Sequence, residues 1–100
     1  MRIRLLAVNP ISTNYLSDYD VDVVHSFDKA KAMIILAEAN NNPYDELDLP
    51  VHHKSQFWKF VRWMEKTNRK YSFSIFGARN ERQFSKIAQK VRSKGFHFNS

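Results

Sequence analysis

Hydrophobic residues recur at every second position in residues 1–8 and again in residues 44–49. Such alternation is typical of β-strands that have one solvated face, and a proline follows shortly after each of the two segments. Residues 21–25 predict a further short strand between them. The hydroxyl of Ser26 then provides an N-cap for a helix that we expect to end near Ala39.

Helical spacing dominates the second half of the chain. Apolar residues separated by three and four positions predict a helix that begins at His53 or Lys54 and ends at Asn68. The same spacing predicts a third helix over residues 80–94, and an alternating strand over residues 71–76 separates the two. After Gly95, a natural C-cap, the segment Phe96-His97-Phe98 is expected to form a fifth strand.

The predicted order of elements is therefore β-β-α-β-α-β-α-β, within a chain of 100 residues that fits a single domain, residues 1–100. Strands that alternate with helices imply parallel pairing through right-handed crossovers, which would place all three helices on one face. Polar residues within the strands argue against a sheet that is buried on both faces. The sequence thus predicts a two-layer α/β fold of five mostly parallel strands.

The alternation also predicts which side of each strand faces the helices. We expect these inward positions to be Ile3, Leu5, Ala7, Leu47, Leu49, Phe73, Ile75, Phe96 and Phe98. On the opposite, open face we expect Arg2, Arg4, Asp48, Ser72, Ser74 and His97. One alternative for function is therefore a protein-interaction or homodimerising domain that uses Arg2, Arg4, Asp48, Ser74 and His97 on this open face.

Three segments carry a resemblance to a known family. They are Met1-Arg2-Ile3-Arg4-Leu5 followed by Asn9-Pro10, Val24-His25-Ser26-Phe27-Asp28-Lys29-Ala30, and Tyr44-Asp45-Glu46-Leu47-Asp48-Leu49. Together they resemble the cyclic-phosphate-processing receiver-like domains. The resemblance implies a receiver (flavodoxin-like) fold that is trimmed of its first and last helices. The family acts on phosphate esters through an acidic pocket, whose acidic positions here are occupied by Leu6, Ala7, Pro50 and His52. The resemblance thus implies the fold, whereas the residues at the pocket positions argue against the family's activity.

Charge is distributed very unevenly along the chain. Residues 1–51 hold four Lys or Arg and eight Asp or Glu, whereas residues 52–100 hold twelve and two, for an overall net charge of +6. A strongly basic half is the electrostatic footprint of a polyanionic partner, usually nucleic acid, although an acidic protein surface has the same effect. A solubilising face, or a dipole that pairs subunits head to tail, remains the alternative.

The outer faces of the second and third predicted helices hold the most informative group of side chains. At 100° per residue, Trp58, Arg62 and Arg69 fall within roughly 40° of one another, with Lys66 beside them. A tryptophan among arginines suits base stacking or a protein contact, unless it covers a seam between helices. The first hypothesis is a non-enzymatic binding module for nucleic acid or an acidic protein, whose contact residues are Trp58, Arg62, Lys66, Arg69, Arg82, Lys86 and Lys90.

A second group is expected at the carboxyl ends of the strands, where open parallel sheets bind ligands. Its members are Asn9, His25, Ser26, His52, His53, Gly77, Arg79 and Asn80. Gly77-Ala78-Arg79-Asn80 precedes a helix and suggests a phosphate seat, or simply a turn whose asparagine caps the helix. Adjacent His52 and His53 lack a third ligand at metal-binding spacing, so no metal or cofactor is predicted. A phosphoesterase-like enzyme at this pocket is the remaining alternative.

The chain contains no cysteine, which excludes disulfides and cysteine nucleophiles. Its longest apolar run, residues 32–37, is too short to span a bilayer, and the basic start lacks the pattern of a signal peptide. We therefore expect a cytoplasmic protein with no membrane partner.

Overall fold

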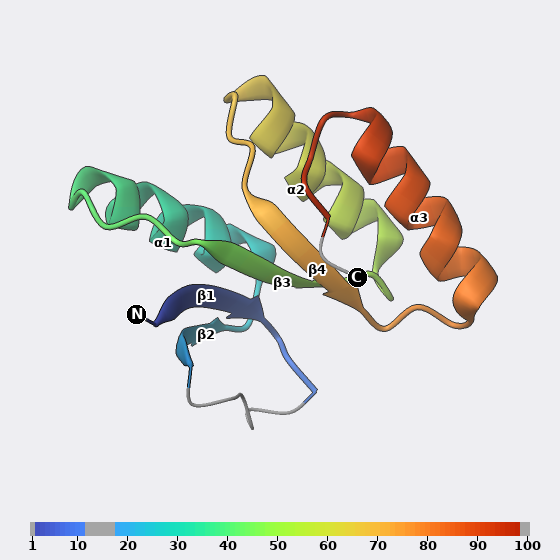
Figure 1. The fold of residues 1–100 in the computed structure, drawn as a ribbon, viewed down its shortest axis with the longest axis horizontal. Helices are drawn as coiled ribbons and strands as arrows, with labels where there is room; N and C mark the ends of the chain where they lie inside the picture. The colour runs from blue at the N-terminus through green and yellow to red at the C-terminus, as the bar shows by residue number, and fades with distance from the viewer. Residues whose placement is uncertain (1, 12–17, 99–100) are drawn as a thin grey trace.

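The computed structural model describes residues 2–11 and 18–98. These residues form an α/β fold of four strands and three helices (Figure 1). In chain order the elements are β1 (Ile3–Val8), β2 (Tyr19–Val24), α1 (Phe27–Ala39), β3 (Glu46–Pro50), α2 (Lys54–Lys66), β4 (Ser72–Phe76) and α3 (Glu81–Ser93). Met1 and residues 12–17, which belong to the predicted first strand and the loop after it, lie outside the described residues.

The strands pair in the order β2-β1-β3-β4, and every pair is parallel. All three helices lie on one side of this sheet (Figure 1). This is the arrangement that right-handed crossovers produce when the chain steps across a sheet in one direction from β2 to β4. The predicted parallel α/β architecture is confirmed.

A single hydrophobic core fills the space between sheet and helices. Leu47, Leu49 and Phe73 contribute from the strands, and all three are completely buried. Phe57 and Phe60 are the largest fully buried side chains of α2, on the face that the i, i+3, i+4, i+7 spacing predicted. The core joins residues from every helix and strand, so the elements stabilise one another as one unit.

The fifth strand predicted over residues 96–98 is not confirmed. Within residues 96–98 the structure has one isolated bridge, between Phe98 and Phe73, supported by a hydrogen bond from the Phe73 N–H to the His97 carbonyl at 3.1 Å. Phe96 and Phe98 are buried as predicted, with ring centroids 5.6 and 6.0 Å from that of Phe73. The segment is held mainly by its side chains, because a single bridge does not form a hydrogen-bonded ladder.

The predicted orientation of β1 is wrong. The register pairs Leu6 with Leu47 and Leu5 with Glu46, so the even-numbered residues of β1 face the helices. Ile3, Leu5 and Ala7 therefore lie on the opposite face. Residues 5–8 are all apolar, so an alternation with period two could not decide which side faces inward.

Arg4 consequently lies on the helix side and not on the open face as predicted. Its guanidinium carbon is 4.7 Å from the centroid of the Tyr44 ring, and its Nη1 lies 3.5 Å from an oxygen of Asp20. Tyr44 in turn donates a hydrogen bond of 2.6 Å to Asp22. Arg4 thus completes a polar cluster beside α1 and leaves the set of residues predicted for the open face.

None of the three helices in the described part of the chain is long and apolar enough to cross a lipid bilayer.

Candidate functional site

The α2 and α3 helices lie side by side at one end of the helical layer (Figure 1). A shallow groove of about 60 Å³ between them is lined by Trp58, Val61, Arg62, Glu65, Lys90 and Lys94. The Nζ atom of Lys94 forms an ion pair of 3.1 Å with Glu65 across the groove. This contact joins the carboxyl-terminal ends of the two helices and fixes the spacing of the charges along them.

Trp58 is half-buried in this groove. The ring of Phe57 meets the indole edge-on, with centroids 4.8 Å apart, and the Nζ of Lys90 lies 4.5 Å from the centroid of the indole. Trp58 therefore covers the seam between α2 and α3, which was the alternative to a free stacking platform. Lys90 occupies one face of this ring, where a base could stack only if Lys90 moved away, so on that face the groove presents a charge in place of an open aromatic surface.

Two rows of exposed cations border the groove. Arg62 and Lys66 follow Trp58 at intervals of four residues on α2, and Arg82 and Lys86 precede Lys90 at the same interval on α3. Residues four apart lie on the same face of a helix, so each row runs along its helix. Arg62, Lys66, Arg82 and Lys86 are exposed, and none forms an ion pair within residues 2–11 and 18–98. We call Trp58, Arg62, Lys66, Arg82, Lys86 and Lys90 the basic α2–α3 surface.

Arg69, which was predicted to belong to the same surface, lies elsewhere. The α2 helix ends at Lys66, where the Thr67 hydroxyl donates a hydrogen bond of 2.7 Å to the Trp63 carbonyl, and Asn68 adopts a positive φ of 57°. The periodicity of 100° per residue does not extend past this point. Arg69 turns instead toward α1.

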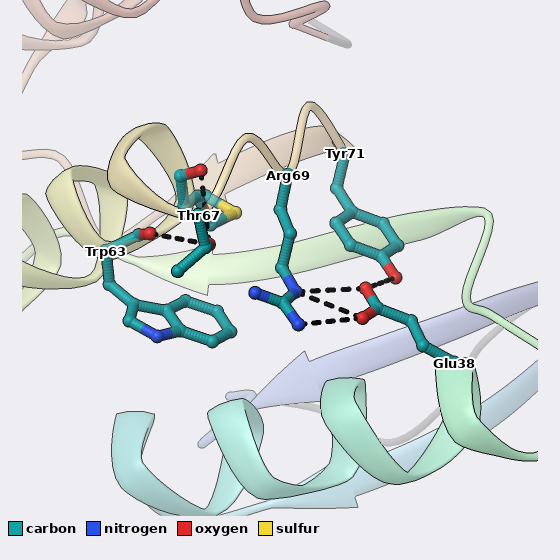
Figure 2. A network of polar contacts seen from close by, with 6 residues as sticks. Glu38, Trp63, Thr67, Arg69 and Tyr71 are labelled. Carbon is teal, nitrogen blue, oxygen red and sulfur yellow. Dashed lines mark hydrogen bonds and ion pairs between the residues drawn. The ribbon is translucent and has the colours of Figure 1, made fainter.

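Arg69 and Glu38 of α1 form a bidentate ion pair, with Nη2 and Nε of the arginine 2.9 and 3.1 Å from the carboxylate (Figure 2). The Tyr71 hydroxyl donates a further hydrogen bond of 2.6 Å to Glu38. The Arg69 guanidinium, helped by Tyr71, holds the pKa of Glu38 below its ordinary value against the opposing effect of burial. Burial, and then the bond to Glu38, raises the pKa of Tyr71. This network joins α1 to the segment after α2 and leaves Arg69 no free charge for a partner.

The second group of candidate residues is brought together only in part. A cleft of about 440 Å³ is lined by His52, Lys54, Gly77, Arg79 and Gln83 at the carboxyl ends of β3 and β4. The rings of His52 and His53 lie 4.7 Å apart, and both residues are exposed. Asn9 and His25, at the ends of β1 and β2, do not line this cleft. Sequence reasoning missed Lys54 and Gln83, although their places in the first turns of two helices could have suggested them.

Hydrogen bonds within the chain use several of the groups that were expected to bind phosphate. The Asn80 side chain accepts a bond of 2.9 Å from the Gln83 N–H, and the Arg79 N–H donates to the Gln83 side chain at 2.6 Å. Ser26 likewise caps α1 by accepting from the Lys29 N–H at 3.1 Å. Asn80 is thus the N-cap of α3, in agreement with the alternative that this segment is a turn whose asparagine caps the helix. Among the described residues there is no group of three or more His, Cys, Asp or Glu that could hold a metal ion.

The backbone after β4 needs a glycine at position 77, beside His52 of the cleft. We expect Gly77→Ala to destabilise the fold by about 1–3 kcal/mol. Gly77 has a φ of +85°, and a Cβ atom at this position would lie 2.7 Å from Nδ1 of His52. Gly95→Ala is a matched control, because Gly95 has a similar φ of +88° but its Cβ would find no atom closer than 3.9 Å. Urea unfolding of both variants measures the difference.

The same comparison in a His52→Ala background separates backbone strain from the clash with the imidazole. The two glycine substitutions should then cost about the same, because the side chain that Gly77 avoids is gone. A difference that persists would show that His52 does not determine the need for Gly77.

The open face of the sheet keeps three of its five predicted contact residues, Asp48, Ser74 and His97. The Ser74 hydroxyl donates a hydrogen bond of 3.2 Å to Asp48, and His97 is exposed. Arg2 is exposed just before β1, and the alternation of β1 assigns it to the same side as Arg4. Arg4 lies on the other side, as described above. Leu5 and Ala7, which replace it on this face, are buried, so the exposed polar surface is smaller than the sequence predicted.

Comparisons with known proteins found no family model, no curated protein and no solved structure that matches this chain.

Proposed function

We propose that this protein is a small non-enzymatic binding module that engages nucleic acid through the basic α2–α3 surface. The observation that carries the proposal is the pair of parallel cation rows on α2 and α3, whose outer members have no ion pair within the described residues. α2 holds four basic residues and one acidic residue, Glu65, and that carboxylate is engaged by Lys94. A polyanionic partner would supply the negative charges with which these cations form no ion pair within the described residues.

The geometry of the groove supports an electrostatic contact with the phosphate backbone. Successive cations in each row are four residues apart, which is about 6 Å along a helix. Phosphates recur every few ångströms along a nucleic-acid strand, so neighbouring cations can each meet one. Trp58 lies between the rows under Lys90, where a bound strand would alter its surroundings.

The cleft near His52 gives an enzyme less support. Its lining residues are His52, Lys54, Gly77, Arg79 and Gln83, and no carboxylate is among them. General acid–base hydrolysis of a phosphate ester would need a second titrating group beside the histidine. We therefore favour binding over catalysis.

The test is a titration of short labelled single-stranded DNA, duplex DNA and RNA, followed by fluorescence anisotropy at 50 and 200 mM salt. If four cations contact phosphates of a duplex, the slope of log K against log salt should be about −3.6, and the affinity should fall about a hundredfold between the two conditions. Failure to bind any of the three at 50 mM salt would contradict the proposal.

Charge-reversal variants locate the surface. Arg62→Glu with Lys86→Glu should weaken binding at least tenfold at 50 mM salt and make the slope shallower by about two units. Arg2→Glu with Lys31→Glu changes the net charge by the same amount away from this surface and should retain most of the affinity. An equal loss in both double variants would indicate a general charge effect and reject the basic α2–α3 surface. The tryptophan signal should change on binding in the wild type and not in Trp58→Phe, where Trp63 remains.

We also infer that the fold is a trimmed relative of the receiver (flavodoxin-like) arrangement. The strand order β2-β1-β3-β4 supports this, because flavodoxin-like sheets have the order 2-1-3-4-5. Leu6 and Ala7, at the positions where the resembling family has acidic residues, are completely buried. This burial supports a relative that binds rather than one that hydrolyses phosphate esters.

A further inference from the structure

The outer side of α1 is an exposed apolar stripe. Ile35 and Leu36 are 48% and 55% exposed, and Ala32 and Ala39 are the exposed residues one turn before and after them. These four residues occupy positions i, i+3, i+4 and i+7, so they form one continuous face of the helix. We call them the α1 stripe.

The α1 stripe is unlike the outer faces of the other two helices, which carry Arg62, Lys66, Arg82 and Lys86. The inner side of α1 is already packed on the core through Ala30, Ile34 and Ala37. A helix that is apolar on both sides is normally covered on both sides. Among the described residues Ile35 and Leu36 remain about half exposed, and Leu36 also borders a small cavity of about 120 Å³ with Met33 and Tyr44.

We propose that a second copy of this chain covers the α1 stripe, with the two α1 helices antiparallel about a two-fold axis. The stripe has the order small, large, large, small, which is the same from either end. An axis that passes between Ile35 and Leu36 places Ile35 against the partner's Leu36, and Ala32 against the partner's Ala39. A two-fold interface requires this self-complementarity, and the small residues at both ends let the helices approach closely.

The helix dipoles favour the same pairing. Antiparallel helices place the amino-terminal end of each α1 beside the carboxyl-terminal end of the other, where the partial charges are opposite. The exposed Asp28 and Lys29 of each copy both approach the last turn of the partner's α1, so their charges largely offset each other there.

The position of α1 also keeps the strongly basic parts of the two copies apart. In the helical layer α1 lies at the opposite end from α3, with α2 between them (Figure 1). A contact through α1 therefore directs both basic α2–α3 surfaces away from the interface, where their mutual repulsion is screened by salt.

The dimer should be weak. Helices of 13 residues are about 20 Å long, so their contact is smaller than the roughly 800 Å² per partner of a standard interface. We expect a dissociation constant in the range of roughly 1–100 μM, which equilibrium sedimentation of the protein alone can measure. A wild-type protein that stays monomeric up to 500 μM would overturn the proposal.

Ile35→Glu and, separately, Leu36→Lys should weaken the dimer at least tenfold, because each places two charges in the centre of the interface. Both positions are exposed, so the variants should fold like the wild type, as far-UV circular dichroism can verify. The matched control is Val23→Glu, which charges an exposed apolar residue, 38% exposed, on the other face of the sheet. If Val23→Glu dissociates the dimer and the α1 variants do not, the open sheet face is the interface and the proposal fails.

Cysteine crosslinking tests the orientation, because the chain has no cysteine of its own. Ala32→Cys with Ala39→Cys should form a disulfide-linked dimer under mild oxidation, whereas each single variant should not. Crosslinking of the single variants would indicate parallel helices and overturn the antiparallel arrangement. Neither experiment contains nucleic acid, so a negative result leaves the proposed binding function to be judged by its own titration.

Discussion

Phe73→Ala is expected to destabilise the protein by about 3–5 kcal/mol. Phe73 is completely buried in β4, and its ring lies 6.3, 5.6 and 6.0 Å from the rings of Phe57, Phe96 and Phe98. Truncation would leave a cavity at the point where α2, β4 and residues 96–98 meet. Since small domains have about 5–15 kcal/mol of stability, urea denaturation should show a large fraction of it lost.

Phe73→Leu is the control for this prediction. It keeps an apolar side chain of similar bulk and should cost less than half as much as the alanine variant. A loss below about 1 kcal/mol for Phe73→Ala would show that the surrounding rings close the cavity, and would contradict a rigid cluster around β4.

Glu38→Ala should cost about 2 kcal/mol at neutral pH, because the carboxylate accepts charge-assisted hydrogen bonds from Arg69 and one from Tyr71. Removing it leaves a half-buried guanidinium and a half-buried hydroxyl without their acceptor. Glu65→Ala is the matched control, since its ion pair with Lys94 also joins two segments but rests on a single contact of 3.1 Å. We expect a cost below about 1 kcal/mol for the control, and equal costs would contradict a special role for Glu38.

The same network predicts how the difference between wild type and Glu38→Ala varies with pH. Because the pKa of Glu38 is lower in the folded protein than its ordinary value of 4.5, its contribution is complete above that value. The contribution is lost as the pH falls below 4.5 through the folded pKa. The pKa of Tyr71 is raised first by burial, which Glu38→Ala leaves in place, and then by the bond to Glu38, so only the part due to Glu38 enters the difference. That part is complete below the ordinary value of 10.0 and is lost as the pH rises above it. Thermal unfolding at pH 3, 7 and 11 measures both limits, and a difference that is constant across this range would contradict the assignment.

The parallel α/β layering could be predicted from the sequence because period-two and helical spacing alternate clearly along most of the chain. Leu47, Leu49, Phe57 and Phe60 show this, since each lies where the pattern placed it. β1 shows the limit of the method. Four consecutive apolar residues satisfy either orientation, and only the pairing with β3 decides that Leu6 faces the helices.

The candidate surface was predictable where its residues share a regular helix. Lys86 and Lys90 are related by one helical turn, and so are Trp58 and Arg62, so their grouping follows from local geometry. The prediction for Arg69 was wrong because α2 ends three residues before it, and no local signal in the sequence fixes a helix end to that accuracy. The approach of Lys90 to Trp58 depends on the packing of two helices, which a single sequence does not encode in any short pattern.

The two edges of the sheet differ in a way that bears on aggregation. β4 is shielded along part of its length by residues 96–98, through the bridge from Phe98 to Phe73. β2 is the other edge, and the register places Asp20 and Asp22 on its helix-facing side, where carboxylates must remain near water or near Arg4 and Tyr44. A second chain that added a strand here would bury these charges, which natural edge strands use to resist such pairing. The sheet can therefore remain four strands wide at high protein concentration without growing into a fibre.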